Sequence, residues 1–399
     1  MAIKTISELD IAGRRLFVRV DFNVPLTPAG GVADDTRIRE SLPTIKYAID
    51  KGARVVLASH LGRPKGKVDK KYSLEPVAAK LAELIGAEVA LTDEPVGDGA
   101  RKVVNDLKAG GVALLENLRF SPAEEANEEG FARQLASYAD VYVNDAFGTA
   151  HRAHASTVGI TKFVAAKGMG LLMEREVKFL GQLLGDVERP FIAIIGGAKV
   201  SDKIAVLENL LGRVNQLLIG GAMANTFLLA LGKSVEKSLA EHDLLKTAQD
   251  ILAKAKAAKK EIVLPIDAVV AEKFEANAPS RTVSVDAVGP NEMILDIGPK
   301  SIEQVVSVLA RCKTLVWNGP FGAFEMEPFD TGTVEVAEAA AELTKAGKLV
   351  TVAGGGDTVA ALNAAGAADR FTYVSTAGGA FLEWLEGKAL PGVEVLRLK

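Results

Sequence analysis

The most constraining feature of the chain is a series of short runs rich in Val, Ile and Leu, separated by intervals long enough for a helix. The first four runs are RLFVRVDF from Arg15, RVVLAS from Arg54, VALLEN from Val112 and VYVNDA from Val141. Because these runs are almost continuously apolar, they are typical of parallel strands covered by helices on both faces. The repeated strand and helix units therefore predict an α/β fold with a doubly wound parallel sheet.

A second series of runs occupies the other half of the chain. Its members are FIAIIGG from Phe191, VNQLLIGG from Val214, EIVLP from Glu261, TLVWNGP from Thr314 and KLVTVAGGG from Lys348. Between the two series, residues 170–184 carry apolar residues at helical spacing, and Gly185 and Pro190 follow. A chain of 399 residues also exceeds what one core usually supports. We therefore expect two Rossmann-like domains, residues 1–170 and 186–380, joined by an inter-domain helix at 170–185.

Composition narrows the possible partners and the location of the protein. Lys and Arg number 47 against 51 Asp and Glu, a net charge of −4, so no overall positive field attracts nucleic acid. The N-terminus MAIKTISELD lacks a basic segment followed by an apolar one, and no stretch approaches the roughly 18 apolar residues of a membrane span. Cys312 is the only cysteine, so no internal disulfide forms. We expect a cytoplasmic protein that binds neither nucleic acid nor membranes.

Polar residues in the first half follow the ends of the predicted strands, where ligands bind in open α/β sheets. They are Asp21, Asn23, Arg37, His60, Arg63, Arg119, His151, Arg152 and His154. Guanidinium groups bind carboxylate and phosphate oxygens in pairs, and Asp21 and Asn23 add acceptors for a hydroxyl. A surface ion pair would explain any one arginine, but four at strand ends favour a pocket for a small molecule with phosphate, hydroxyl and carboxyl groups. His151 and His154 lack further ligands, so we expect no metal site there.

Three junctions in the second half join glycines to the start of a predicted helix, an arrangement that binds anions through backbone N–H groups. GGAKVSDK contains Gly197, Lys199 and Lys203, and the spacing of the two lysines would place them on one helix face. VAGGGDTV contains Gly354, Gly355, Gly356, Asp357 and Thr358, with Asp357 positioned to hold Mg²⁺ on phosphates. VSTAGG contains Gly378 and Gly379, whose amides would face the transferred group. Exposed lysines and a tight turn capped by Asp357 are the structural alternatives.

Other residues of the second half suit the rest of a nucleotide. Asn318 is predicted to lie near phosphate, Glu325 to accept from a ribose hydroxyl, and Gly220 with Gly221 to form a flat wall for adenine. The common nucleotide-binding loops are absent. LGKS at 231–234 has Phe227 where a Walker A loop needs its first glycine, and GMGLLM from Gly168 lacks the third glycine of the dinucleotide motif.

Together, these motifs resemble the phosphoglycerate kinase family in order and spacing, from RVDFNVP at Arg19 to GKALPGVEVL at Gly387. The resemblance implies transfer of a phosphoryl group from 1,3-bisphosphoglycerate to ADP, which gives 3-phosphoglycerate and ATP with Mg²⁺. It implies a monomer with glycerate bound by the first domain and nucleotide by the second, and a tail from about residue 381 that packs on the first domain. By resemblance, the glycerate site is Asp21, Asn23, Arg37, His60, Arg63, Arg119 and Arg152. By resemblance, the nucleotide site includes Lys203, Glu325 and 354–358, and Lys199 and Arg37 act on the transferred group.

The implied reaction needs no general base, because a carboxylate and a nucleotide phosphate are both ionised at pH 7. Direct in-line transfer then depends on positioning and on charge neutralisation by Arg37, Lys199, Lys203, Mg²⁺ and the amides of Gly378 and Gly379. Because the two substrates bind different domains, we expect hinge closure, with the 170–185 helix as the hinge. Two departures from the family pattern are Ala377 and Ala222, which stand where glycine is common. If position 377 requires a positive φ, alanine there costs on the order of 1 kcal/mol.

Two other functions fit a doubly wound fold. A nicotinamide-dependent dehydrogenase shares such domains, but the sequence lacks its glycine motif. A non-catalytic metabolite sensor would need neither Lys199 nor the second glycine junction. A thermal-shift comparison of NAD with Mg-ADP distinguishes a dehydrogenase from a kinase. An assay for ATP formation distinguishes a metabolite sensor from a kinase.

Overall fold

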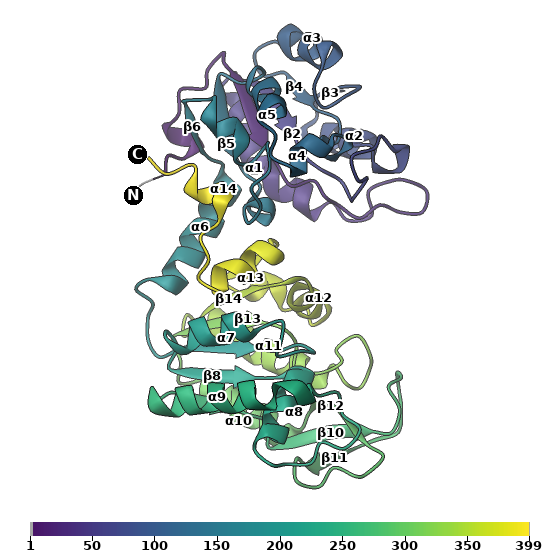
Figure 1. Ribbon diagram of the computed structural model, residues 1–399, viewed down its shortest axis with the longest axis vertical. Helices are drawn as coiled ribbons and strands as arrows, with labels where there is room; N and C mark the ends of the chain where they lie inside the picture. Colours follow the sequence, from purple (N-terminus) through teal and green to yellow (C-terminus); the bar gives the residue numbers. More distant parts are fainter. Residues whose placement is uncertain (1–2, 399) are drawn as a thin grey trace. The chain divides into compact units, whose positions relative to one another are not determined.

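The computed structural model describes residues 3–398, which form two compact units (Figure 1). Unit 1 contains the chain up to Lys178 together with Ala389 onward, and unit 2 contains Phe179–Lys388. The boundary at Lys178 falls inside helix α6, Leu171–Leu184, which the apolar spacing of residues 170–184 predicts. The segment between the two predicted series of strands is thus one continuous helix.

Unit 1 is built on a six-stranded sheet that is parallel throughout, with the strand order β3-β4-β2-β1-β5-β6. The strands are β1 Arg15–Arg19, β2 Arg54–Ala58, β3 Val89–Leu91, β4 Val112–Leu114, β5 Val141–Asn144 and β6 Lys167–Met169. The chain leaves β1 toward β2 and later returns to β5 on the other side of β1. The carboxyl ends of β1 and β5 therefore flank the point where the strand order reverses, which is where such sheets bind ligands.

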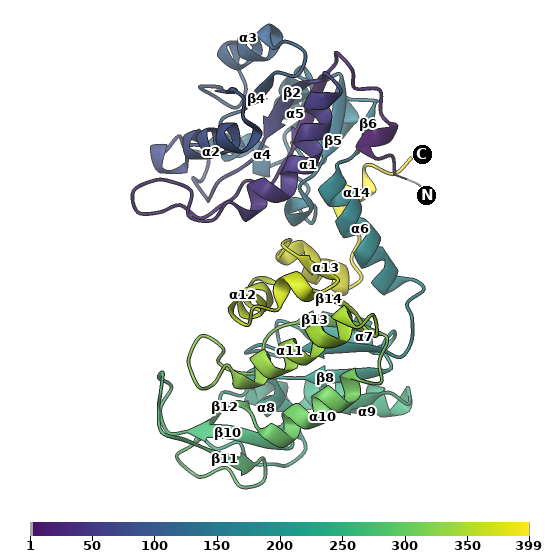
Figure 2. The ribbon, with the colours of Figure 1, turned by 180° about the vertical axis from the view of Figure 1, so that it is seen from behind.

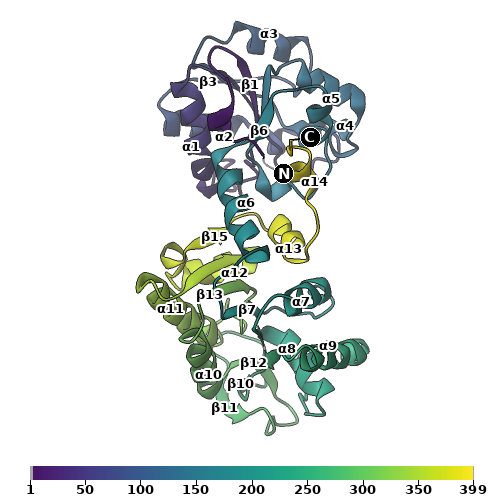
Figure 3. The same cartoon turned by 90° about the vertical axis from the view of Figure 1, so that its left-hand side faces the viewer.

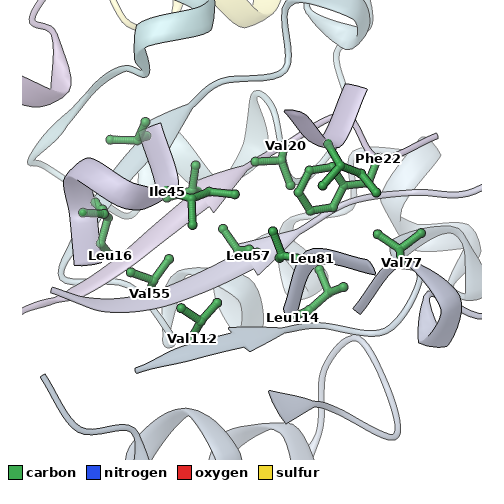
Figure 4. Packing of buried hydrophobic residues seen from close by; sticks show 14 of the residues in the cluster. Leu16, Val20, Phe22, Ile45, Val55, Leu57, Val77, Leu81, Val112 and Leu114 are labelled. Atoms are coloured by element: carbon green, nitrogen blue, oxygen red, sulfur yellow. The ribbon is translucent and has the colours of Figure 1, made fainter. Parts of the chain in front are cut away.

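Helices cover both faces of this sheet, as the apolar character of its strands requires. They are α1 Thr36–Asp50, α2 Glu75–Ile85, α3 Asp98–Asp106, α4 Pro122–Glu125, α5 Glu129–Ala136 and α14 Pro391–Glu394. Figures 2 and 3 show α1 and α2 on the face opposite α4 and α5. Ile45 of α1 and Leu81 of α2 pack against Leu16, Val55 and other strand residues in a buried cluster (Figure 4).

Unit 2 repeats this architecture with the order β15-β14-β13-β7-β8-β9, again parallel throughout. Its strands are β7 Phe191–Ile195, β8 Gln216–Ile219, β9 Glu261–Val263, β13 Thr314–Asn318, β14 Val350–Gly354 and β15 Tyr373–Ser375. The strand order reverses between β7 and β13. The predicted α/β class with two doubly wound parallel sheets is confirmed.

Layers of helices enclose the unit 2 sheet on both faces. They are α7 Ile204–Leu211, α8 Gly221–Ala230, α9 Leu245–Ala257, α10 Pro299–Leu309, α11 Thr331–Lys345, α12 Gly356–Ala364 and α13 Gly379–Leu385. Figure 3 shows α7, α8 and α9 on one side of the strands, and α10 and α11 on the other. Trp317 of β13 is fully buried in the cluster between the sheet and α10 and α11.

A second sheet in unit 2 is antiparallel and was not expected from the sequence. It has the order β11-β10-β12, formed by β10 Asp267–Ala271, β11 Ser280–Ser284 and β12 Met293–Ile297. Four of the five residues of β11 are exposed, so this strand lacks the apolar run that reveals the others. The sheet lies beside α8, because α8 packs on β12.

The last residues of the chain belong to unit 1. The Asn144 Nδ2 donates to the Gly392 carbonyl at 3.3 Å, and the Gly392 amide donates to the Ala150 carbonyl at 2.8 Å. Ile3 and Arg397 form an antiparallel bridge, so the segments that begin at Ile3 and end at Leu398 lie side by side (Figure 3). The tail thereby contacts the segment after β5, which carries several candidate site residues. No helix within residues 3–398 is long and apolar enough to span a membrane.

Candidate active site

The polar residues that follow β1 form the centre of the unit 1 site. Asp21 is largely buried, and its Oδ2 accepts from the Arg37 Nη1 at 2.7 Å, which connects the end of β1 to the first turn of α1. The Asn23 Oδ1 accepts from the Gly62 amide at 2.8 Å and thus binds the loop after β2. Since Arg37 remains half-exposed, its guanidinium retains donors for a ligand.

His60, which follows β2, is buried, with 4% of its area exposed. The Arg19 Nη2 lies 3.2 Å from its Nδ1. Burial, followed by the charges of Arg19, Arg119 and Arg37, holds the pKa of His60 well below its usual 6.5. The imidazole is therefore uncharged at neutral pH and acts through hydrogen bonds.

Arg119 lies in a short turn of helix at Leu118–Phe120 and is 6% exposed. Its Nη1 donates to the Gly62 carbonyl at 2.9 Å. Its Nε makes no hydrogen bond, although the Glu125 carboxylate lies 3.4 Å away. Burial lowers the pKa of Arg119, yet a guanidinium stays charged at any physiological pH. A buried cation with an unused donor favours an anionic ligand.

The remaining candidates of unit 1 differ in exposure. Arg63 and Arg152 are exposed, and the Arg152 Nε donates to the His151 Nε2 at 3.2 Å. His154 is buried, and burial together with nearby arginines lowers its pKa to about 3. Within residues 3–398, no group of three or more His, Cys, Asp or Glu side chains is arranged to hold a metal ion.

In unit 2, one chain of hydrogen bonds joins the ends of three strands. Lys203 donates to the Asn318 Oδ1, and the Asn318 Nδ2 donates to the Gly354 carbonyl at 2.6 Å. The Gly319 amide donates to the Thr358 Oγ1 at 2.7 Å. These contacts connect the segment after β7 with β13 and with the β14–α12 junction. Burial lowers the pKa of Lys203 to about 8, although Asp357 opposes the change.

The argument that Lys199 and Lys203 share a helix face is wrong. Helix α7 begins at Ile204, and the Lys203 amide donates to the Val200 carbonyl at 2.9 Å in a turn that precedes the helix. Lys199 therefore lies in the loop and is exposed, whereas Lys203 is the residue immediately before α7. Lys203 reaches Asn318 by this turn geometry and not by helical periodicity.

Close backbone approach explains the glycines at the β7 and β13 ends. A Cβ on Gly196 would lie 2.1 Å from the Pro320 carbonyl oxygen, and one on Gly319 would lie 2.2 Å from the Gly196 oxygen. Two other predicted glycine junctions occur at helix starts: α12 begins at Gly356 after Gly355 at φ +99°, and α13 begins at Gly379 after Gly378 at φ +52°. A helix start leaves backbone amides without partners inside the helix, so both N-termini are suited to bind an anion.

A cavity of about 480 Å³ opens beside these junctions. Of the predicted nucleotide residues, Gly197, Gly221, Glu325 and Asp357 line it. Gly220 does not line it, because it packs against Phe321, whose ring a Cβ would approach to 2.4 Å. Asn318, Lys203, Thr358, the glycines 354–356 and the pair 378–379 are also outside its lining.

The cavity has an apolar wall that motif reasoning missed. Leu239, Phe274, Met293 and Phe324 contribute to it. Phe274 is 63% exposed and Leu239 56%, which is unusual for large apolar side chains and suits a flat ring that would cover them. Neither of these two residues belongs to a glycine motif at the end of a strand, so their exposure in the fold is the signal that reveals them.

The two alanine departures fit their positions. Ala222 is the second residue of α8, and Ala377 precedes Gly378, which takes the positive φ of this turn. Ala377 itself is not among the residues with positive φ. The cost considered for alanine at this position therefore does not arise.

Buried guanidinium groups in one doubly wound unit, and a cavity beside glycine-capped helix N-termini in the other, define the class of two-unit α/β phosphotransferases. Comparison with known proteins identifies the family: the model of phosphoglycerate kinase matches residues 6–388. The chain belongs to the phosphoglycerate kinase family, and it is a kinase.

Individual relatives agree with this assignment. The chain is 54% identical over 396 residues to a phosphoglycerate kinase of Anaeromyxobacter sp. (strain K), with 99% of both chains covered. It is 56% identical over 396 residues to that of Xanthobacter autotrophicus, with the same coverage. The solved phosphoglycerate kinase of Coxiella burnetii superimposes with a TM-score of 0.91 at 41% identity over 99% of each chain, and that of Pyrococcus horikoshii with 0.84 at 34% over 98%.

Proposed function

We propose that this kinase catalyses reversible, Mg²⁺-dependent, direct in-line transfer of a phosphoryl group from 1,3-bisphosphoglycerate to ADP, giving 3-phosphoglycerate and ATP in glycolysis. Membership of the family supports the substrates. The observation that carries the site assignment is that the two units offer different groups to a ligand: unit 1 has guanidinium groups in the segments that follow its strands β2, β4 and β5, and unit 2 has a cavity lined in part by glycines.

The glycerate is proposed to bind unit 1. Its phosphate and carboxylate suit the guanidinium groups of Arg63, Arg119 and Arg152, because these carry fixed charge and paired donors. Its hydroxyl suits the acceptors of Asp21 and Asn23, with His60 as a neutral hydrogen-bond partner. Arg37 has a second role, which is to stabilise the equatorial oxygens of the transferred group.

The nucleotide is proposed to bind unit 2. Adenine would occupy the apolar wall beside Gly221, and the ribose would contact Glu325. The phosphates would bind near Lys203 and Asn318 and the N-terminal amides of α12, where the helix dipole favours negative charge. Lys199 and the amides of Gly378 and Gly379 would contact the transferred group.

Asp357 is the proposed protein ligand of the metal. It lies in the first turn of α12, is exposed, and lines the nucleotide cavity. One carboxylate suffices, because Mg²⁺ on a nucleotide takes most of its oxygen ligands from phosphates and water. When bound, Mg²⁺ would neutralise phosphate charge, and Asp357 would fix its position on the cavity rim.

No side chain is needed as a base, since both acceptor groups are ionised at neutral pH. The protein instead holds the reacting groups in line and excludes water, which would hydrolyse the acyl phosphate. Because the proposed substrates bind different units, we propose that bending at α6 closes them around the substrates. The cytoplasmic location and the monomeric state remain predictions.

The decisive experiment is ATP formation from 1,3-bisphosphoglycerate and ADP by the purified protein, with and without Mg²⁺. ATP that forms only with the metal supports the proposal. Equal rates after chelation contradict the metal requirement, and no ATP under either condition contradicts the reaction. Small-angle X-ray scattering with 3-phosphoglycerate and Mg-ADP together tests closure, which requires a smaller radius of gyration than either ligand alone produces.

A further inference from the structure

Arg19 is a buried arginine that the proposed substrate contacts do not use. It ends β1 and is 1% exposed, so it cannot act as a surface charge. Its Nε donates to the Ser156 Oγ at 2.8 Å, its Nη1 donates to the Val20 carbonyl, and its Nη2 lies 3.2 Å from the His60 Nδ1. All three guanidinium nitrogens therefore have partners inside unit 1.

The contact with His60 has a defined direction. A guanidinium has only donors, so the His60 Nδ1 must be the acceptor and carries no hydrogen. The ring is then neutral, and its hydrogen is on Nε2. The charged groups that act on His60 are Arg19, Arg119 and Arg37, and all three oppose a second proton; His154, with a pKa of about 3, would act in the same direction only once protonated.

A buried carboxylate holds Arg19 in place. The Ser156 Oγ donates to the Glu124 Oε1 at 2.5 Å, so the lone pairs of the hydroxyl are left for Arg19. The Ser156 amide donates to the Glu124 Oε2 at 3.0 Å. Glu124 lies on α4 and is fully buried; burial raises the pKa of its carboxyl group, and the Arg19 charge, with the hydrogen bonds from Ser156, opposes that change. Four segments of unit 1 thus meet in one sequence of hydrogen bonds.

We propose that Arg19 is a positioning residue that fixes His60 as a neutral donor, with its single N–H at Nε2 directed to an oxygen of the substrate. This inference rests on the proposed glycerate site. It adds the protonation state and the tautomer in which His60 contacts the substrate. His60 then contributes a hydrogen bond without charge or proton transfer. Its contribution to substrate binding stays constant across the pH range in which an ordinary histidine titrates.

The first test needs no variant. Long-range proton–nitrogen correlation spectra of the whole protein report the tautomer of each imidazole, and the chain has only 4 histidines. The His60→Asn variant identifies the His60 signals, because they are missing from its spectrum. The variant should keep the local structure, because an amide oxygen can accept from Arg19 in place of Nδ1. We expect the Nε2–H form from about pH 8 to about pH 5.5. An Nδ1–H tautomer, or a second proton taken up in this range, overturns the proposal.

The second test replaces Arg19 with Lys, which keeps a positive charge beside Glu124. We expect His60 to lose its single tautomer and the Kd for 3-phosphoglycerate to rise about tenfold, the size of one lost hydrogen bond, while the Kd for Mg-ADP is unchanged. Arg15→Lys is the matched control, since Arg15 begins the same strand and pairs with Asp140 at 2.7 Å. Unchanged His60 signals in the Arg19→Lys variant overturn the positioning role.

These measurements separate the inference from the proposed function. If wild-type protein binds no 3-phosphoglycerate, the glycerate site is wrong, whereas the His60 spectrum still reports whether Arg19 fixes the tautomer. If Arg19→Lys does not fold, the wild-type spectrum and the His60→Asn variant decide the question. His60→Asn should fold, bind Mg-ADP normally and bind 3-phosphoglycerate about tenfold more weakly; undiminished binding of 3-phosphoglycerate overturns the donor role.

Discussion

Replacing Lys203 with Met should abolish activity. The same replacement should stabilise unit 2, and the gain in stability should be larger at neutral pH than at alkaline pH. The buried ammonium donates to Asn318, and burial holds its pKa at about 8 against the usual 10.5, although Asp357, Asp202 and Glu386 oppose the change. Each unit of pKa corresponds to about 1.36 kcal/mol. The difference of 2.5 between the two values therefore corresponds to a cost of about 3 kcal/mol for the charged folded state.

The sign of the pH dependence follows from these two pKa values. At pH 7, Lys203 is protonated in both the folded and the unfolded chain, and the folded state carries the full cost of the buried charge. As the pH rises through about 8, the folded protein releases the proton and the cost falls, while the unfolded chain keeps its proton up to about 10.5. The stability advantage of Met over Lys should therefore fall by about 2 kcal/mol between about pH 7 and about pH 9.5.

Urea unfolding followed by tryptophan fluorescence measures this difference in the intact chain. Both tryptophans, Trp317 and Trp384, belong to unit 2, so their signal reports the unfolding of that unit. Packing changes and the lost contact with Asn318 contribute equally at both pH values and cancel in the comparison. Lys199→Met is the matched control, because Lys199 is exposed and carries no burial cost. A Lys203→Met advantage that is constant or rises with pH would refute the reasoning.

Three further predictions test other parts of the molecule. Arg37→Ala should lower kcat by about 10³ to 10⁵ with unchanged affinity for ADP, measured by a coupled assay and calorimetry; near-normal turnover contradicts its role on the transferred group. Gly221→Ala should destabilise unit 2 by more than about 1 kcal/mol and weaken nucleotide binding, because Gly221 has φ +67° and a Cβ would lie 2.4 Å from the Gly197 oxygen; unchanged urea midpoints contradict it. Burial raises the pKa of Asp145 to about 7, so ionisation costs folded-state stability as the pH rises from about 4 to about 7. The Tm of Asp145→Asn minus the Tm of wild type should therefore increase from pH 5 to pH 8. A Tm difference that stays constant over this range contradicts the argument.

Local pattern was sufficient for the longer strands of the two large sheets. Runs such as those at Phe191 and Thr314 are apolar on both faces because helices cover both faces, and this property is visible in the sequence. The antiparallel sheet was missed, because β11 is mostly exposed and has no apolar run. The short edge strands β3 and β6 are three residues each, too short to give a periodic signal.

Side chains that act through distant partners were harder to find. Arg19 belongs to an apolar run, and nothing nearby in the sequence reveals that Ser156 and His60 receive its donors. Phe274 and Leu239 were missed for a related reason: an apolar side chain is expected in a core until the fold leaves it exposed at a cavity. The error at Lys199 arose because helical spacing was applied to a turn that ends one residue before α7.

The candidate site of unit 1 carries its positive charge on guanidinium groups, whereas that of unit 2 carries it on the Lys203 ammonium group. We therefore expect substrate binding to depend on pH mainly in unit 2. In unit 1, the cations are guanidinium groups that keep their charge, while burial and these same arginines hold His60 and His154 neutral. In unit 2, Lys203 has a pKa of about 8. An anionic phosphate at the proposed site beside Lys203 would favour the charged form of Lys203, so we expect nucleotide binding to take up a proton above this pH. If the two sites are as proposed, alkaline pH should weaken nucleotide binding and leave glycerate binding nearly constant.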